Sequence, residues 1–572
     1  MFFIALTKQE IAQNFHSEKI EEFKINSFIV TIVTDQFLSA FFSESNGFSI
    51  VESPLISSSG YQNVIFSQLT YHCDKEFLTI FKSTISGRPI YYHINSKGEF
   101  FCSTHISLLK IAGVPIEENI DVLPEFFVYR FVMPPNTLYK NIEQLCGGGQ
   151  LQIKIENDKC RVHPTDYYNP TPLNQKIKSI KNGSEILYNY LSESIKKLDC
   201  CKDELAILLS GGIESSIISK ICKKNFTIDR SYSTGYPFES PLLNVEKRYA
   251  LSAAAALGMQ HSYYEPTTHE YLLGFIEAIS LAEEPLHHLQ SPLLHLLMKN
   301  KIPKNEKIVL CGQGGGSSFG GNYYFYINEN KDNTFFRLLT TKPVLGSLKV
   351  ISQFVGKGEE IIDILSKATS DHVLSDPNNP MWSWMRYGNK EWVCKFFNVK
   401  EENIIKNRFN VVKQIFNNNI YDLWSLYSLF SDEEITLNIW SKIGEGNKKI
   451  LYYPFYDSTV LNCVFSIPWD LKLRGLKDIL RKEIARQSNI PEFMIKRTKS
   501  SFGIRSRRWA KKGGVFEPLI PLCSKVFDEK EIRKMQSSDS NMMIFWNILN
   551  YSIWKRLCIY DEPLEVLLEE VE

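Results

Sequence analysis

The sequence lacks most of the features that would assign it to a specialised class of protein. Its 572 residues contain no low-complexity tract and no internal repeat, and 65 Lys and Arg stand against 64 Asp and Glu, a formal net charge of +1. Phosphate backbones are bound through a surplus of basic side chains, so nucleic acid is not expected as a partner. With 44% hydrophobic and 23% charged residues, the composition is that of a large globular protein with several domains.

Targeting and anchoring segments are also missing. The amino terminus has no basic flank before a long apolar stretch, and the most apolar early run, residues 27–42, carries Asp35 and is too short to cross a bilayer. The 12 cysteines are scattered and form no C-x-x-C pair. We therefore expect a cytoplasmic protein with reduced thiols and no membrane partner.

Two common nucleotide-binding motifs are absent as well. The chain contains no G-x-x-x-x-G-K-[ST] segment, which disfavours a Walker-type kinase or ATPase, and no G-x-G-x-x-G segment, which disfavours dinucleotide binding. His287, His288 and His295 have no cysteine or acidic neighbour at ligand spacing beyond Glu283 and Glu284. The pattern therefore favours ordinary helix histidines over a metal site.

Two regions of different character follow one another along the chain. Residues 1 to about 160 contain β-branched and aromatic runs separated by turn residues, with a hairpin predicted around Asn95–Gly98. After a linker at 169–175, residues 184–198 have the apolar spacing of a helix. From there on, short apolar strands alternate with helices, which is typical of an α/β domain.

The most informative segment is ELAILLSGGIESSIISKICKK, residues 204–224. A strand, a glycine-rich turn and a helix in this order place free backbone N–H groups and the positive end of a helix dipole at the carboxyl edge of a parallel sheet, which suits pyrophosphate. Ser210, Ser215 and Ser216 offer hydroxyl groups, and Glu214 offers a carboxylate for Mg²⁺. The same pattern also fits an ordinary tight turn with a serine cap.

A second glycine-rich turn follows in KIVLCGQGGGSSFGGNYY, residues 307–324, after the apolar strand Ile308–Leu310. Two such turns at the ends of two sheet strands would let the backbone approach a nucleotide from both sides. A surface loop is the alternative interpretation of this segment.

With these motifs, the chain resembles the asparagine synthetase family. SGGIESS is similar to the S-G-G-x-D-S pyrophosphate loop of that family, and CGQGGGSSFGGNYY is similar to its S-G-E-G-x-D-E-x-F-G-G-Y loop. Further segments resemble family motifs in the same order: 244–261, 282–297, YYPFYD at 452–457 and LKDILRK…SSFG at 476–503. Upstream, residues 87–110 and 137–151 resemble the end of the family's glutaminase domain, so the resemblance covers nearly the whole chain.

The resemblance implies a fold and a reaction. It implies an Ntn-hydrolase-like αββα sandwich over residues 1–168 and an α/β, parallel-sheet synthetase domain with a pyrophosphate loop over residues 176–572. Members of the family use ATP and Mg²⁺ to adenylate a carboxylate, release pyrophosphate and let an amine attack the acyl-adenylate. By position, Lys477 would be the catalytic cation and Glu214 the metal ligand. The residues implied to bind ATP are Leu209, Ser210, Gly211, Gly212, Glu214, Ser215, Ser216, Thr234 and Gly312.

The chain also departs from the family pattern. Phe2 stands where the family's amidotransferases have a nucleophilic Cys, and the first cysteine is Cys73, so glutamine hydrolysis is not expected. The amine would then come from the substrate, as in the β-lactam and lasso-peptide macrolactam synthetases. A precursor peptide and a companion protease would be partners in the second case. Ammonia-dependent asparagine synthesis is an alternative.

The second glycine-rich turn departs further. It has Gln313, Gly316 and Ser317 where the family has acidic residues, and Tyr452 stands in place of the usual Arg. Losing a carboxylate ordinarily weakens a magnesium site. A catalytically dead or reassigned family member that binds a nucleotide or a partner is therefore a further alternative.

Overall fold

A computed structural model describes most of the chain. The described residues are 2–15, 19–25, 27–34, 39–44, 47–52, 56–57, 60–61, 67–72, 77–83, 88–165, 170–171, 173, 177–236, 245–318, 343–344, 347–348, 389–400, 403–404, 408, 425–474, 477–496, 509–536 and 542–571.

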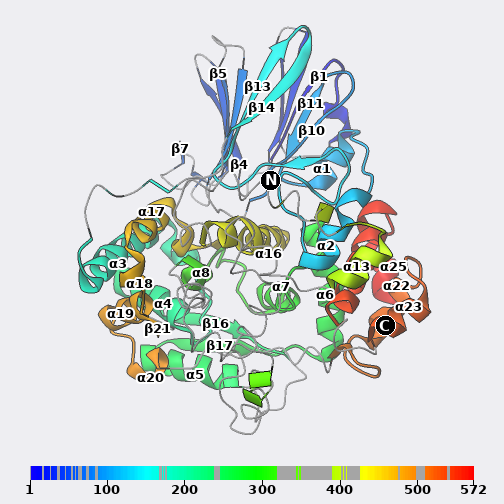
Figure 1. The fold of residues 1–572 in the computed structure, drawn as a ribbon. Helices are drawn as coiled ribbons and strands as arrows, with labels where there is room; N and C mark the ends of the chain where they lie inside the picture. The colour runs from blue at the N-terminus through cyan, green and yellow to red at the C-terminus, as the bar shows by residue number, and fades with distance from the viewer. Residues whose placement is uncertain are drawn as a thin grey trace.

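Two six-stranded antiparallel sheets form the N-terminal part of the molecule, at the top of Figure 1. The first sheet has the order β12 (Glu143–Gln144), β10 (Tyr91–Ile94), β11 (Phe100–Ser103), β1 (Phe2–Thr7), β3 (Phe28–Thr34), β2 (Lys19–Ile25). The second has the order β14 (Lys159–Thr165), β13 (Gln150–Glu156), β9 (Phe77–Lys82), β8 (Ser67–His72), β5 (Gly47–Glu52), β4 (Ser39–Glu44).

The first sheet is buried on both faces. Along β1, Phe2, Ile4 and Leu6 point into a core shared with the second sheet. The alternate residues Phe3 and Ala5 join a different core, together with the short helices α1 (Ile106–Ile111) and α2 (Leu123–Tyr129). This period-two alternation is the packing expected of a strand covered on both sides.

The hairpin predicted around Asn95–Gly98 is confirmed. β10 and β11 pair in antiparallel register with Ile94 opposite Phe100. Gly98 has a φ of +77°, and a Cβ there would lie 2.6 Å from Cβ of Lys159. The turn therefore needs glycine both for its conformation and for the close approach of β14.

A parallel sheet organises the second half of the chain, as the alternation of strands and helices predicts. β15 (Leu205–Ile207), β18 (Ile308–Leu310) and β19 (Ile450–Tyr452) pair in parallel, and so do β16 (Arg230–Thr234) and β17 (Gln260–Tyr264). A parallel bridge between Leu208 and Tyr232 joins the two groups. Numbered in sequence order, the strands therefore run 3-2-1-4-5 across the sheet.

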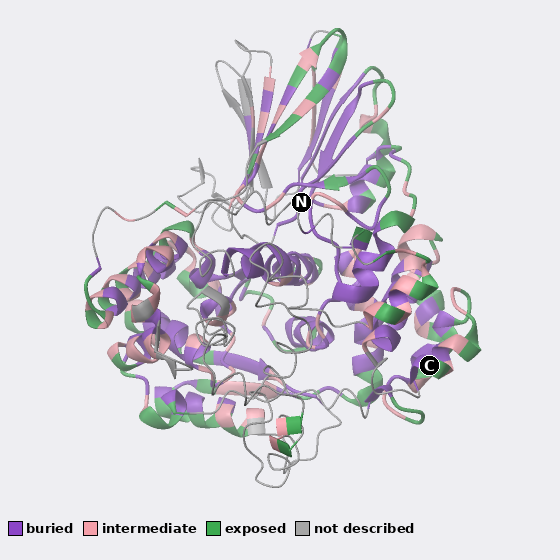
Figure 2. Cartoon of the chain, viewed as in Figure 1, coloured by how far each residue is buried: buried purple, intermediate pink, exposed green. Residues whose placement is uncertain are grey.

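Helices cover both faces of this sheet. Leu205 and Ile207 point into one core and Ala206 into the other. The first face is covered by α3 (Ile180–Lys196), α4 (Ile213–Asn225), α5 (Val245–Leu257), α17 (Ser458–Ser466) and α19 (Ile479–Gln487). The second is covered by α6 (Thr268–Ala282), α7 (Ser291–Asn300) and α16 (Glu434–Gly446). Figure 2 shows α16 buried along its length, between this sheet and the sandwich.

The C-terminal helices pack beside α2 and α6, at the right of Figure 1. They are α22 (Ile520–Cys523), α23 (Glu529–Gln536), α24 (Met542–Trp554) and α25 (Leu564–Glu569), and the short helix α13 (Lys390–Phe396) lies with them, against α2. Short helices elsewhere are α8 (Gly315–Ser318), α18 (Trp469–Lys472) and α20 (Glu492–Ile495). Within the described ranges, no helix is both long and apolar enough to cross a bilayer. The ten cysteines with described side chains are all free thiols.

Candidate active site

The two glycine-rich turns leave neighbouring strands at the carboxyl edge of the parallel sheet. The first follows β15 and the second follows β18, which pair with Ile207 opposite Leu310. In the strand order 3-2-1-4-5, these are the first and fourth strands, between which the order reverses. Open α/β sheets bind ligands at this switch point, so both predicted turns lie where a ligand is expected.

The first turn runs from Ser210 to the start of α4. Gly211 has a φ of +75°, and a Cβ on it would lie 2.5 Å from the carbonyl oxygen of Tyr249, so only glycine fits. Gly212 is the N-cap of α4 and has no side chain to cap the helix. The N–H groups of the first turn of α4 thus belong to a helix end suited to an anion.

The three predicted hydroxyl groups have different surroundings. Ser216 is fully buried and donates to the carbonyl oxygen of Gly212 at 2.7 Å, so it supports the turn from inside. Ser215 contacts Ser210 at 3.1 Å between the two Oγ atoms, and the N–H of Gly212 reaches Ser210 Oγ at 3.3 Å. These long local hydrogen bonds are weak, and a phosphate oxygen can replace them.

The second turn packs directly on the first. A Cβ on Gly312 would lie 2.7 Å from the backbone nitrogen of Ser215, and one on Gly314 would lie 2.5 Å from the ring of Tyr456. Glycine therefore allows a close approach at both positions. Between them, Gln313 donates through Nε2 to the carboxylate of Glu433 at 2.8 Å.

The predicted metal ligand has a partner that the sequence reasoning missed. Arg481 donates through one guanidinium nitrogen to Glu214 Oε1 at 2.8 Å, and the two side chains are 15% and 13% exposed. Arg481 lies in α19, four positions after Lys477, within the LKDILR segment that resembles the family motif. Its position in that motif is the signal that could have identified it.

The remaining predicted residues lie around these turns. Thr234 ends β16, and its buried Oγ1 has no hydrogen-bond partner among the described residues. Leu209 donates its N–H to Tyr232 at 2.9 Å, but its side chain is fully buried in the core below the sheet. The backbone of Lys477 lies in β21 (Lys477–Asp478), before α19, and its side chain is outside the described part of the structure.

Two sequence departures can also be located. Tyr452 points away from the turns into the core, where its hydroxyl lies 2.9 Å from Oγ of Ser194 in α3. Glu306, the nearest acidic residue before the second turn, precedes β18 and therefore lies at the opposite edge of the sheet. Gly316 is in α8, and the side chain of Ser317 is outside the described part. Glu306 therefore does not replace the missing acidic residue, and the carboxylate that reaches this turn is that of Glu433, which accepts a hydrogen bond from Gln313.

The expectation that His287 and His288 lie in a helix is wrong. Both lie before α7 rather than within it, and Asp432 joins them from the π-helical segment Leu429–Glu433. Sequence spacing gave no carboxylate near this pair because Asp432 is distant in the chain. His295 does lie within α7, where it contacts Glu277 at 2.7 Å.

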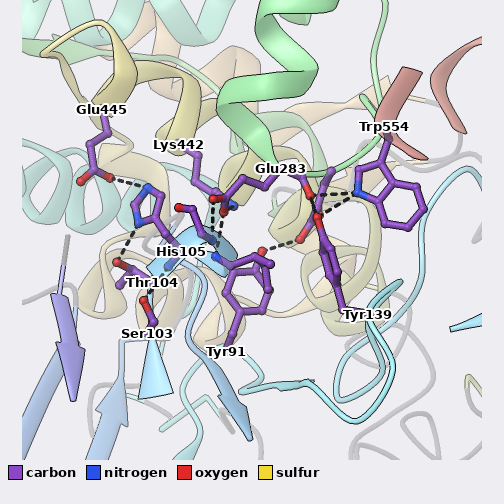
Figure 3. A network of polar contacts seen from close by, with 12 residues as sticks. Tyr91, Ser103, Thr104, His105, Tyr139, Glu283, Lys442, Glu445 and Trp554 are labelled. Atoms are coloured by element: carbon purple, nitrogen blue, oxygen red, sulfur yellow. Dashed lines mark hydrogen bonds and ion pairs between the residues drawn. The ribbon is translucent and has the colours of Figure 1, made fainter. Parts of the chain in front are cut away.

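A network of buried polar groups joins this half of the chain to the sandwich (Figure 3). Lys442 of α16 contacts Glu283 at 2.6 Å, and Glu283 also accepts the backbone N–H groups of Ile106 and Ser107 at 2.8 and 2.9 Å. Burial acts to raise the pKa of Glu283, but Lys442 and His105 outweigh it and lower that pKa to about 2. Glu283 is therefore an ionised carboxylate held by several donors.

A second carboxylate, which belongs to α16, extends this network. Glu445 lies beside Arg88 and 3.6 Å from Nε2 of His105, whose Nδ1 contacts Thr104 Oγ1 at 3.0 Å. Burial lowers the pKa of His105. Phe2 lies next to this network, with its backbone N–H 3.2 Å from Thr104 Oγ1 and its ring fully packed in the sandwich.

Comparison with known proteins agrees with this geometry. The asparagine synthase family model matches residues 187–403 and 451–541, which include both turns and α19. Asparagine synthetase [glutamine-hydrolyzing] 1 of Bacillus subtilis is 23% identical over 430 residues, covering 74% of this chain and 65% of that enzyme. Asparagine synthetases of Zea mays and Lotus japonicus are 24% and 25% identical over 29% of this chain and about 30% of their own lengths.

Proposed function

The chain belongs to the asparagine synthase family, and we propose on that basis that it is an ATP-dependent carbon–nitrogen ligase that forms AMP and pyrophosphate. The observation that supports this most directly is the meeting of two glycine-rich turns at the switch point of the parallel sheet. Their backbone N–H groups and the start of α4 suit the phosphates of ATP.

Each predicted site residue has a role in this proposal. Ser210, Gly211, Gly212 and Ser215 would hold the pyrophosphate end of ATP, with Ser216 supporting the turn. Leu209, Thr234 and Gly312 would flank the adenosine, Leu209 through its backbone. Lys477 would face the charge that develops on the phosphates during adenylation, where a fixed cation stabilises the transition state.

A single carboxylate is available for Mg²⁺ at the first turn, and it fits as one ligand among waters. Glu214 would hold the ion, which supplies charge neutralisation for the phosphates when bound. In the structure Arg481 neutralises this carboxylate at 2.8 Å. We infer that Arg481 turns from Glu214 to a phosphate oxygen when the nucleotide binds, so that both charges stay compensated.

The amine would come from the substrate rather than from glutamine. β1 contains no cysteine, and the ring of Phe2 fills the sandwich core, so this strand offers no thiol nucleophile. We propose that residues 1–168 form an Ntn-hydrolase-like domain kept as a scaffold, and that residues 176–572 form the synthetase domain. Closure of a peptide macrolactam or a related natural product would then be the reaction, with a precursor peptide and a companion protease as partners.

A catalytically dead or reassigned nucleotide-binding member is the second candidate. The substitution of Gln313 for a family acid and the Glu214–Arg481 pair favour it, because together they leave no unpaired carboxylate in the described part of the two turns. Ammonia-dependent asparagine formation is a third candidate, which predicts aspartate-dependent pyrophosphate release with ammonium salts and none with glutamine.

Pyrophosphate release tests the proposal. The purified chain is incubated with ATP, Mg²⁺ and candidate carboxylate and amine substrates, and Lys477→Ala is expected to lower the rate about 100-fold or more. Lys482→Ala, in the helix α19 that follows Lys477, is the matched control and is expected to keep the wild-type rate. Equal slow release by wild type and Lys477→Ala would contradict the ligase assignment. If millimolar ATP also fails to raise the melting temperature, nucleotide binding is contradicted too.

A further inference from the structure

Three potential metal ligands meet beside the second glycine-rich turn. His287 and His288 approach Asp432 so that one ligand atom from each residue lies within 4.8 Å of the others. His287 is 1% exposed, and the other two are half-buried. We propose that these three residues form a binding site for a first-row divalent cation of the zinc type, separate from the Mg²⁺ site assigned to Glu214.

The carboxylate is placed where it can share a cation with the two imidazoles. Asp432 Oδ1 lies 2.5 Å from Nε2 of His287, so this ion pair already brings a ligand oxygen and a ligand nitrogen together. A divalent cation would replace this contact and take both atoms, with a nitrogen of His288, as its ligands. The position therefore suits a cation shared by the three side chains.

The donor set selects the kind of cation. Two imidazole nitrogens and one carboxylate oxygen are the ligands of zinc and related first-row metals, whereas Mg²⁺ prefers oxygen ligands alone. Asp432 also lies in the π-helical segment Leu429–Glu433, a rare geometry that is found frequently at functional sites.

Arg130 is the group that opposes cation binding here. One of its guanidinium nitrogens lies 3.3 Å from Nε2 of His287. This imidazole nitrogen is the atom that would bind the ion. Binding a divalent cation must therefore break this contact, and the ionised carboxylate of Asp432 offsets the remaining repulsion. The ring of Phe131 packs on His287 with centroids 4.8 Å apart and holds the imidazole in place.

The location links this site to the candidate active site. Glu433, the residue after Asp432, accepts a hydrogen bond from Gln313 in the second turn at 2.8 Å. A cation here would lie next to the second glycine-rich turn. It would orient an oxygen or nitrogen atom of the acyl or amine substrate. This role rests on the proposed ligase function, but binding of the cation does not.

Metal binding by the full-length chain tests the site directly. Protein stripped with a chelator is titrated with Co²⁺, followed by its visible absorption, and Zn²⁺ is added as competitor. We expect one equivalent of Co²⁺ to bind and Zn²⁺ to displace it. His288→Gln and Asp432→Asn are each expected to weaken binding at least about tenfold. His295→Gln, which alters another buried histidine beside a carboxylate, is the matched control and should bind like wild type.

The outcomes separate this proposal from the ligase assignment. Failure of wild type to bind Co²⁺ or Zn²⁺ overturns the site, as does binding that both variants retain while circular dichroism shows them folded. A loss of the same size in His295→Gln would mark the binding as non-specific and also overturn it. Pyrophosphate release is measured separately with Mg²⁺ alone, so loss of that activity contradicts the ligase and leaves the cobalt titration as an independent result.

Discussion

The junction between the sandwich and the rest of the chain holds its charges differently from the two glycine-rich turns. At the junction, Lys442 is 1% exposed and bonds Glu283, which accepts two further backbone N–H groups. At the turns, the local hydrogen bonds of Ser210 are 3.1 to 3.3 Å long, and Glu214 and Arg481 are both partly exposed. At the junction the Glu283 carboxylate is held by three donors of its own chain, while the turns can exchange their contacts for those of a ligand.

This difference separates structural from functional polar groups. A buried ion pair with all its hydrogen bonds made is a fixed part of the fold, because either partner left alone would be an uncompensated buried charge. A partly exposed pair is stabilised less and can open at low cost. Substitutions in the two regions should therefore differ in what they change, stability at the junction and ligand binding at the turns.

Removing the junction cation should have the largest effect. Lys442→Met leaves the Glu283 carboxylate buried without its main counter-charge, and we expect the free energy of unfolding to fall by about 3–5 kcal/mol. Urea denaturation measures this change. Lys299→Met is the control, because that lysine is 47% exposed in its pair with Glu277 and should cost less than about 1 kcal/mol. Equal losses in both variants would mean that the buried pair stabilises the fold no more than an exposed one.

The free energy of unfolding that the junction contributes should fall in acid and not at neutral pH. The pKa of Glu283 is lowered to about 2 in the folded chain, from an ordinary glutamate value when unfolded. Its contribution to stability is present above the unfolded pKa and is lost as the pH falls from about 4.5 towards 2. Denaturation at several pH values should show this loss, with a smaller slope in Lys442→Met. The idea fails if the slope is unchanged in that variant.

Separating the two turns should have an intermediate effect on stability and a large one on binding. In Gly312→Ala the new methyl group would lie 2.7 Å from the backbone of Ser215, so one turn must move away from the other. We expect a loss of about 1–3 kcal/mol in stability and a drop in ATP affinity of about tenfold or more. Isothermal titration calorimetry with ATP measures the latter.

Gly113→Ala is the control for that experiment. Gly113 has a φ of +88°, but a Cβ on it would meet no atom within 4 Å. It should therefore cost about 1 kcal/mol of backbone strain and leave the ATP affinity unchanged. An ATP affinity that falls equally in both variants would mean that contact between the turns does not matter for binding.

The smallest stability effect is expected at the Glu214–Arg481 pair. Arg481→Gln should lower the free energy of unfolding by only about 1 kcal/mol, because the glutamine amide can still donate a hydrogen bond to the Glu214 carboxylate. Its effect on ATP binding should exceed its effect on stability, since Arg481 is inferred to contact phosphate. Thermal melts with and without ATP compare the two. A variant that melts far below wild type but binds ATP normally would assign Arg481 to the fold alone.

The sequence predicted the local elements well and the long-range contacts poorly. The hairpin at Asn95–Gly98, each short apolar strand and the two turns depend on residues close together in the chain, and the structure confirms them. Arg481 beside Glu214 and Asp432 beside His287 depend on which distant helices meet, which spacing alone does not reveal. Family resemblance supplied Lys477 and the adenosine-side residues, whose roles stay predictions.

The strand order also constrains how this molecule acquires its structure. Leu205 pairs with Ile308, and Ile308 pairs with Ile450, so the central sheet assembles from segments that are far apart in the chain. Closing such long loops is entropically expensive, and proteins dominated by distant pairings fold slowly. The edge that carries the two turns therefore cannot form before β18 has been synthesised, about 100 residues after β15, and a shortened chain that ends before Ile450 would lack the outer strand of this sheet.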